Sequence, residues 1–138
     1  MTLRAPQPGD AERIVAARDE EFHRWLGPGS ETPTPFACIQ VEDELVGWVD
    51  YDRDPVHDWL GPGEVNVGYF LFPSARGKGY ASRAIELLLT HLRHDTGHRA
   101  ATLLIHPENS RSLALADRLG FVRRGEVDGQ PFFTHDLG

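Results

Sequence analysis

The sequence predicts a mixed α+β fold: a mostly antiparallel sheet with flanking helices, in one domain over residues 1–138. Three observations predict it. Apolar residues alternate with polar ones in successive segments between residues 36 and 72, which is typical of neighbouring strands. Helical spacing follows in two later segments, and the order of elements is not the strict alternation of a doubly wound sheet. A chain of 138 residues with 40% hydrophobic residues can also bury one core without a disulfide.

The first half of the chain is expected to hold a short strand, two helices and a hairpin. Proline and glycine mark the ends of these elements, and Asp10 is expected to act as the N-cap of the first helix. An acidic turn at 42–44 separates the two hairpin strands. The expected elements are a strand at 2–5, a helix from Asp10, a helix at 20–26 and strands at 36–41 and 45–51.

The second half is expected to begin with a loop at 52–63 and to continue with alternating strands and helices. Gly68 falls in the middle of the first of these strands, where a glycine marks a bulge, a close approach by a ligand or backbone, or a tolerated packing position. The expected elements are a strand at 64–72, a helix at about 81–94, a strand at 100–105, a helix from Asn109 or Ser110 to 119, and a hairpin of 121–126 with 131–135 around Asp128-Gly129.

Charge and cysteine content limit the classes of partner. The formal net charge is −7, and the excess lies between Glu42 and Glu64, where eight acidic residues face one basic residue. An acidic chain is a poor binder of nucleic acid, because that affinity rests on Lys and Arg. No apolar run approaches the length of a membrane span. The single Cys38 is interpreted as a buried structural residue, and we expect a cytoplasmic protein with neither nucleic-acid nor membrane partners.

Residues 76–81, Arg-Gly-Lys-Gly-Tyr-Ala, join a strand to a helix through two glycines. Such a turn presents free backbone N–H groups and the positive end of a helix dipole, and so forms an anion site; Arg76 and Lys78 add charge. A nucleotide P-loop would need a hydroxyl residue after Lys78, where Gly79 stands, and a dinucleotide fingerprint would need a glycine in place of Ser82. An ordinary strand-to-helix turn remains the alternative.

The segment VGYFLFPSARGKGYA at 67–81, with NSRS at 109–112 and LGF at 119–121, resembles the GNAT superfamily of acetyl-CoA dependent N-acetyltransferases, in its RimJ/RimL-like branch. The resemblance is specific over residues 64–124. It implies a GNAT fold with a bulged, splayed central strand, acetyl-CoA as cosubstrate and no metal. The acceptor it implies is a small amine or a peptide N-terminus, and the protein would be a monomer or a homodimer.

The resemblance also implies roles for individual residues. Ser112 matches the position that donates a proton to the departing thiolate, and Ala116 stands where many members carry a tyrosine. Asn66 replaces the glutamate that often serves as base, so Glu64, two residues earlier, is the candidate base. Asp50, Asp52 and His57 compete with it. The residues expected to contact the coenzyme are Leu71, Phe72, Arg76, Gly77, Lys78, Gly79, Tyr80, Ala81 and Asn109.

Two functions remain open at this point. The first is direct transfer of an acetyl group from acetyl-CoA to a primary amine, with the acidic stretch 42–64 favouring cationic acceptors. The alternative is a non-catalytic acyl-CoA-binding regulatory module that keeps the pyrophosphate turn but lacks a general base, as Asn66 suggests. His91, His94 and His98 have helical spacing, but they are interpreted as a solvated helix end, not as metal ligands.

Overall fold

The computed structural model describes residues 1–52 and 58–138. Hydrogen bonds join its strands in the order β1-β2-β3-β4-β5-β7-β6, which confirms the predicted mixed α+β class. The pair β4–β5 is parallel, whereas β1–β2, β2–β3, β5–β7 and β6–β7 are antiparallel. The elements are β1 (Thr2–Arg4), α1 (Asp10–Ala16), α2 (Glu20–Leu26), β2 (Ala37–Val41), β3 (Glu44–Asp52), β4 (Glu64–Leu71), the 3-10 helix η1 (Pro73–Ala75), α3 (Tyr80–Asp95), β5 (Ala100–Leu104), α4 (Ser110–Arg118), β6 (Val122–Val127) and β7 (Gln130–Asp136).

The chain divides into two compact units. Met1–Asp50 with Tyr69–Ile85 forms the N-terminal unit, and Tyr51–Gly68 with Glu86–Gly138 forms the C-terminal unit. The division falls within β3, β4 and α3, so each of these elements contributes to both units.

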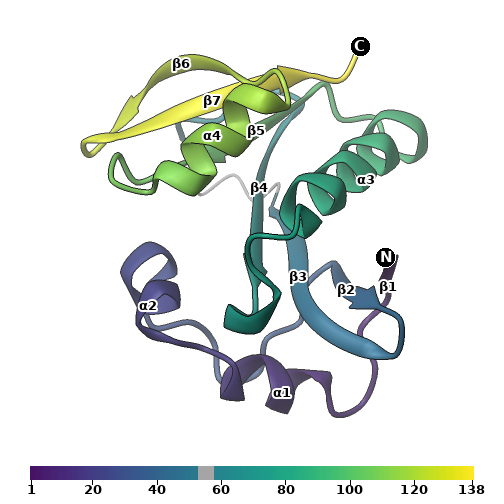
Figure 1. The fold of residues 1–138 in the computed structure, drawn as a ribbon. Helices are drawn as coiled ribbons and strands as arrows, with labels where there is room; N and C mark the ends of the chain where they lie inside the picture. Colours follow the sequence, from purple (N-terminus) through teal and green to yellow (C-terminus); the bar gives the residue numbers. More distant parts are fainter. Residues whose placement is uncertain (53–57) are drawn as a thin grey trace. The chain divides into compact units, whose positions relative to one another are not determined.

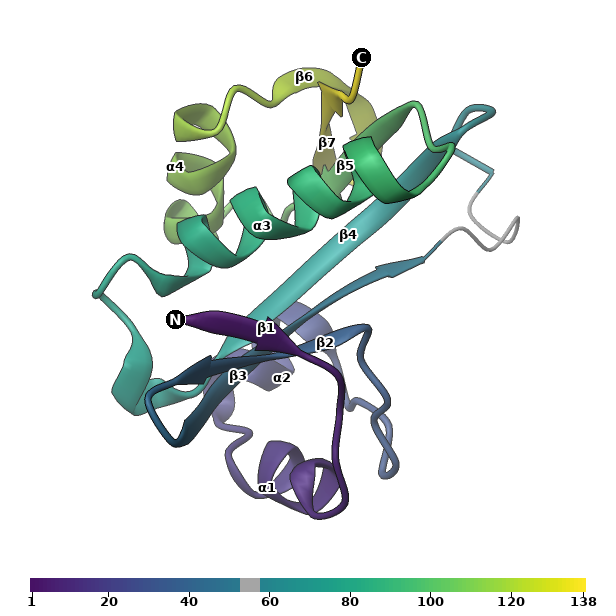
Figure 2. The same ribbon diagram turned by 90° about the vertical axis from the view of Figure 1, so that its right-hand side faces the viewer.

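In the N-terminal unit, β1, β2 and β3 pair side by side in antiparallel order, as Figure 2 shows. The core of this unit contains Ile14 of α1, Cys38 of β2 and Leu45 of β3, which are all at most 4% exposed. Trp48 and Phe72 pack against them. Burial of these apolar side chains stabilises the unit and fixes α1 on the strands.

In the C-terminal unit, β5 pairs with β7, which in turn forms a hairpin with β6 (Figure 1). The hairpin turns at Asp128 and Gly129, whose φ angles of 50° and 82° are those of the tight turn that the sequence predicts. α4 buries Leu115 and Ala116 and ends at Arg118; Leu119 is its C-cap, and Gly120 follows with a φ angle of 80°. The backbone N–H of Phe121 then closes the helix by donating to Ala116 O at 2.9 Å.

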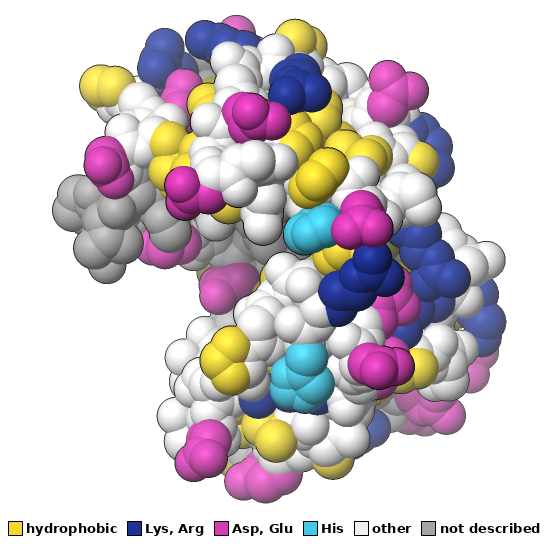
Figure 3. Space-filling model, turned by 90° about the vertical axis from the view of Figure 1, so that its left-hand side faces the viewer, with side chains coloured by type: hydrophobic (Ala, Val, Ile, Leu, Met, Phe, Trp, Pro, Cys, Tyr) yellow, Lys and Arg dark blue, Asp and Glu magenta, His cyan; other side chains and the backbone are white. Residues whose placement is uncertain are grey.

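The predicted boundaries of the strands and later helices differ from the observed ones by one residue. η1 was not predicted, because one turn of 3-10 helix carries no periodic pattern. Among the described residues, no helix combines the length and the apolar character that a bilayer crossing demands. On the face drawn in Figure 3, acidic and basic side chains lie next to one another.

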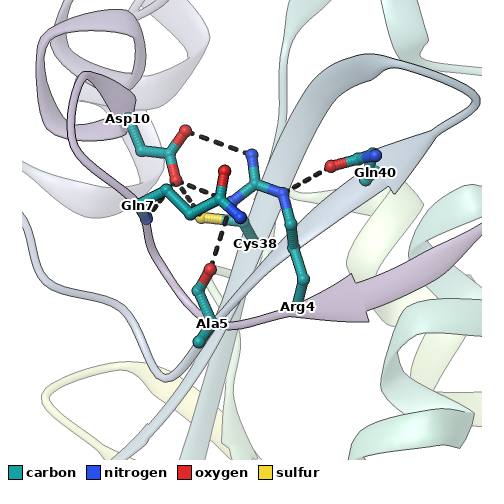
Figure 4. Close-up of polar contacts among 6 residues, drawn as sticks. All are labelled: Arg4, Ala5, Gln7, Asp10, Cys38 and Gln40. Carbon is teal, nitrogen blue, oxygen red and sulfur yellow. Dashed lines mark hydrogen bonds and ion pairs between the residues drawn. The ribbon is translucent and has the colours of Figure 1, made fainter.

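The prediction that Asp10 caps α1 is wrong. The N-cap is Gly9, with a φ angle of 93°, and no side chain caps this end. Asp10 is the first residue of the helix, and its carboxylate turns back to accept the N–H of Gln7 at 2.6 Å and to bind Arg4, as Figure 4 shows. The left-handed conformation of Gly9 directs the chain so that this carboxylate lies inside the unit, 5% exposed, and not over the helix end.

Candidate functional site

The chain passes from β4 to α3 through η1 and a turn that contains two glycines in the left-handed region. Arg76 is extended, with φ −73° and ψ 155°, and Gly77 and Gly79 have φ angles of 78° and 83°. The N–H of Arg83 donates to Gly79 O at 3.2 Å, so Gly79 directly precedes α3, which begins at Tyr80. Helical geometry leaves the N–H groups before Arg83 without carbonyl partners inside the helix, so this end can receive an anion.

The two glycines border open space. A Cβ atom built on Gly77 or Gly79 would meet nothing within 4 Å, so protein packing does not demand glycine at either position. Their positive φ angles do demand it, because a side chain strains the backbone there. Lys78, between them, is exposed and forms no ion pair with any residue of 1–52 or 58–138. The turn therefore combines accessible backbone amides with one exposed cation.

The side chain of Arg76 lies on α2. Its Nη1 is 2.8 Å from both Asp19 Oδ2 and Glu21 Oε2, and its guanidinium lies 5.2 Å from the centre of the Phe70 ring. The hydrogen bonds from Arg76 lower the pKa of Asp19, which also caps α2 by accepting the N–H of Phe22 at 3.0 Å. These two acidic partners were not predicted; an aspartate directly before a helix with acids in its first turn was the available signal.

The two residues expected along the coenzyme arm, Leu71 and Phe72, are held by the N-terminal unit. Leu71 is 8% exposed, and the backbone N–H of Phe72 donates to Val46 O at 2.8 Å. Gly47, which was not predicted as important, allows this pairing: a Cβ there would lie 2.2 Å from Phe70 O. At Gly68 a Cβ would meet nothing within 4 Å, so close approach by another backbone does not explain that glycine.

The start of α4 holds Asn109 and Ser112. Of the two candidate caps, Asn109 and Ser110, the structure has Asn109 as the N-cap, and its Oδ1 accepts the N–H of Ser112 at 3.3 Å. Both side chains are half-buried, and Ala116, one turn further along, is fully buried. The cap fixes the first turn of the helix and with it the position of the Ser112 hydroxyl within the C-terminal unit.

Glu64 and Asn66 begin β4 and point to the same side of the strand. Glu64 Oε1 accepts the N–H of Gly61 at 2.9 Å, and its Oε2 lies 3.7 Å from Arg99 Nη2. Arg99 also donates to Pro62 O from Nε at 3.1 Å and from Nη2 at 3.0 Å. The Oδ1 atom of Asn66 is buried and has no hydrogen-bond partner among the described residues, so its capacity to accept a hydrogen bond is unused there.

The other candidate bases fall into two groups. Asp50 Oδ1 accepts the N–H of Phe36 at 3.0 Å, and Asp52 ends β3. His57, like Asp54 of the acidic stretch, lies outside the described residues. Across residues 1–52 and 58–138, no three His, Cys, Asp or Glu side chains gather as a metal site requires. The structure instead places His91 Nδ1 3.1 Å from Asp95 Oδ2.

The predicted residues therefore form two groups, each described within its own unit. Residues 71–81 belong to the N-terminal unit, and Glu64, Asn109 and Ser112 belong to the C-terminal unit. The first group can bind a phosphate through backbone amides and a lysine. The second offers a hydroxyl, a carboxylate and an unmatched amide oxygen, which are groups that can move or accept protons.

Comparison with known proteins gives these features a family. The family model of the acetyltransferase (GNAT) domain matches residues 1–122. A curated relative, an uncharacterized N-acetyltransferase of Bacillus subtilis strain 168 from the SPbeta prophage, YokL, is 23% identical over 92% of this chain and 78% of its own length. The ribosomal-protein-serine acetyltransferase of Escherichia coli strain K12 is 30% identical over 63% of this chain and 46% of its own length.

Solved structures share the fold. The aminoglycoside acetyltransferase AAC(6')-Ib, in complex with coenzyme A and kanamycin, superposes with a TM-score of 0.80 at 18% identity, over 98% of this chain and 94% of its own. At this identity the likeness concerns the arrangement of helices and strands.

Proposed function

The chain belongs to the GNAT acetyltransferase domain family, and we propose that it transfers the acetyl group of acetyl-CoA to a primary amine. The observation that carries the proposal is the turn at 76–81, with two left-handed glycines facing open space at the start of α3. A diphosphate fits such a turn, because its oxygens accept from backbone N–H groups and approach closely where no Cβ stands. Lys78 supplies an exposed positive charge.

In the proposed reaction the neutral amine attacks the thioester carbonyl carbon, the new C–N bond forms, and the C–S bond breaks. Ser112 donates a hydrogen bond or a proton to the departing thiolate, and Glu64 takes the proton that the amine loses, through water. Asn109 fixes Ser112 by capping α4. Asn66 Oδ1 accepts a hydrogen bond from the attacking amine, which would give this buried atom a partner.

We propose a cationic acceptor, either a small amine or a protein N-terminus. Its support is the acidic stretch from Glu42 to Glu64, which raises the local concentration of positively charged molecules. Related proteins include an enzyme named for ribosomal-protein serine and one solved with kanamycin. The proposed enzyme is a single domain over residues 1–138 that acts in the cytoplasm.

The second candidate is a regulatory module that binds acyl-CoA without catalysis. Asn66 favours it, because an amide cannot act as the general base that a carboxylate provides. The two functions share the coenzyme turn and differ only in the release of free coenzyme A.

Two measurements test the proposal. Calorimetry with acetyl-CoA measures binding by the wild-type protein and by Gly79→Glu, and thiol release is followed with a panel of amines and peptides. We expect at least 100-fold weaker binding by Gly79→Glu, since the new carboxylate strains the turn and repels phosphate. Ser112→Ala is expected to bind normally and to lower kcat about 10- to 100-fold.

Other outcomes would each change the conclusion. Unchanged affinity in Gly79→Glu would remove the coenzyme site from this turn. Normal binding of acetyl-CoA by the wild-type protein, with no thiol release above background for any amine or peptide of the panel, would support the regulatory module over the enzyme. Normal kcat in Ser112→Ala would remove that residue as the proton donor.

A further inference from the structure

The guanidinium of Arg76 contacts the start of α2 and the Phe70 ring. Its Nη1 lies 2.8 Å from carboxylate oxygens of Asp19 and Glu21, and its Nη2 lies 3.3 Å from Asp19 Oδ1. Arg76 and Asp19 therefore form a bidentate ion pair. The Arg76 side chain is 16% exposed and also lies over the Phe70 ring. We call Arg76, Asp19, Glu21 and Phe70 the Arg76 anchor; all four belong to the N-terminal unit.

We propose that Arg76 is a positioning residue for the diphosphate of the coenzyme, acting through Asp19, the N-cap of α2, and Glu21 in its first turn, and not by direct contact with phosphate. This inference rests on the proposed function. It makes α2 a part of the coenzyme site, because the carboxylates at its start hold the residue from which the turn begins.

The charge balance of the anchor argues against direct contact. One guanidinium faces two carboxylates, so the group carries a net negative charge close to the turn. A phosphate bound by Arg76 would have to displace both carboxylates or accept their repulsion. Lys78 is exposed and needs no such exchange, so it is the cation of the turn that can meet phosphate.

The backbone explains why the turn needs an anchor. Gly77 and Gly79 have no side chain, and nothing lies within 4 Å of their Cβ positions, so packing does not hold them in the left-handed conformation. Glycine is the residue with the largest conformational freedom to lose. Arg76 precedes Gly77 directly, and its side chain fixes the chain there in the extended conformation.

A second contact joins α2 to the same strand end. Phe22 of α2 is 3% exposed and packs edge-on against Phe70 of β4, with 5.0 Å between the ring centres. Asp19 caps the helix that carries Phe22 and binds Arg76 with the same carboxylate. The start of α2 therefore contacts both Arg76, through the Asp19 carboxylate, and the end of β4, through the Phe22–Phe70 ring pair.

A double-mutant cycle tests the inference, with coenzyme A as the probe and calorimetry as the measurement. The variants are Arg76→Met, the pair Asp19→Asn with Glu21→Gln, and all three together. Asparagine keeps the helix cap of Asp19, and methionine keeps the apolar stem of Arg76. We expect coenzyme A to bind about 10-fold more weakly to Arg76→Met and to the Asp19→Asn, Glu21→Gln variant. The triple variant should show no further loss of affinity.

The change in coenzyme affinity on removal of the Asp19 and Glu21 carboxylates distinguishes a positioning role of Arg76 from direct contact with phosphate. If Arg76 bound phosphate itself, removing its two acidic competitors would leave the affinity unchanged or raise it, and that result would overturn the inference. Additive losses in the triple variant would overturn it as well. Absence of coenzyme binding by the wild-type protein would instead overturn the proposed function and this inference with it.

A second acetyl donor distinguishes an effect on the diphosphate from a non-specific loss of activity. S-Acetylpantetheine lacks the diphosphate, so kcat/KM for this donor should change less than about 2-fold in Arg76→Met, while kcat/KM for acetyl-CoA falls about 10-fold. Equal losses for both donors would overturn the inference. Arg123→Met is the matched control, because Arg123 is 58% exposed on β6 and pairs only loosely, at 3.6 Å, with Glu126; it should leave both values unchanged.

Discussion

Two arginine–carboxylate pairs in the N-terminal unit have the same chemistry and different surroundings. Arg4 Nη1 lies 2.7 Å from Asp10 Oδ2, and Arg76 Nη1 lies 2.8 Å from Asp19 Oδ2. Each pair joins a short helix to another part of the unit through a carboxylate at the start of that helix. The Asp10 side chain is only 7% exposed, whereas that of Asp19 is 31% exposed.

The surroundings show what each pair does. Asp10 also accepts the N–H of Gln7 and lies 3.6 Å from the thiol of Cys38, so protein groups surround its carboxylate (Figure 4). Hydrogen bonds from Arg4, the largest effect, hold the pKa of Asp10 at about 2. Asp19 is bound by an arginine that adjoins open glycines. The first pair is therefore expected to serve stability, and the second to serve the ligand.

The largest expected effect is that of Asp10→Asn on stability. The substitution leaves Arg4 partly buried without its anionic partner, and removal of one member of such a pair costs about 3 kcal/mol. Urea unfolding followed by circular dichroism measures the change in the free energy of unfolding. A loss below about 1 kcal/mol would show that solvent, and not Asp10, satisfies Arg4.

The second prediction concerns stability in acid. The pKa of Asp10 falls from its ordinary value of 3.8 to about 2 on folding, so the folded state binds this proton less readily than the unfolded chain does. The stabilisation is complete above about pH 4 and is lost as the pH falls towards 2; one pKa unit corresponds to about 1.4 kcal/mol, so the total is about 2 kcal/mol.

Unfolding free energies measured between pH 6 and pH 2 test this, with Asp10→Asn as the control. The difference between wild type and variant should shrink as the pH falls through this window. A constant difference would mean that the carboxyl group of Asp10 titrates alike in the folded and unfolded chains.

These two pairs also show how far the sequence alone could lead. Gly77 and Gly79 were recognisable, because a positive φ angle at the start of a helix restricts the residue type and so leaves a local pattern. Asp10 was expected to cap α1, and instead binds Arg4 across a turn. The contact of Arg76 with Asp19 links residues 57 positions apart, which no local pattern records.

The same distinction applies to the proposed catalytic groups. The sequence predicted a helix that starts at Asn109 or Ser110, and the structure shows that Asn109 is its cap. Glu64 was chosen by its position on a strand, but the contacts of its carboxylate with Gly61 and Arg99 depend on where the tertiary fold places the segments before β4 and before β5. Local geometry can be predicted from residue type, whereas partners brought together by the sheet cannot.

A smaller effect is expected for Cys38→Ala. The thiol is fully buried, and burial, followed by the nearby charge of Asp10, raises its pKa to about 11. Replacing the thiol group by a hydrogen atom leaves a small cavity and removes a weak contact with Asp10. The free energy of unfolding should fall by about 1 kcal/mol. Urea unfolding checks the value, and a thiol reagent should label the wild-type protein only at the rate of unfolding. Rapid labelling under native conditions would contradict the buried position.

The smallest expected change is that of Asp19→Asn on stability, and it is the matched counterpart of Asp10→Asn. The asparagine still caps α2, and a partly exposed ion pair contributes little, so the free energy of unfolding should fall by about 0.5 kcal/mol. The same urea unfolding measurement compares the two variants directly. If Asp19→Asn were as costly as Asp10→Asn, the Arg76 anchor would be a second structural pair. A small loss of stability together with weaker coenzyme binding would instead show that the two arginines have different roles. Arg4 would serve stability and Arg76 would serve the coenzyme, since only Arg76 adjoins glycines whose Cβ positions have no protein atom within 4 Å.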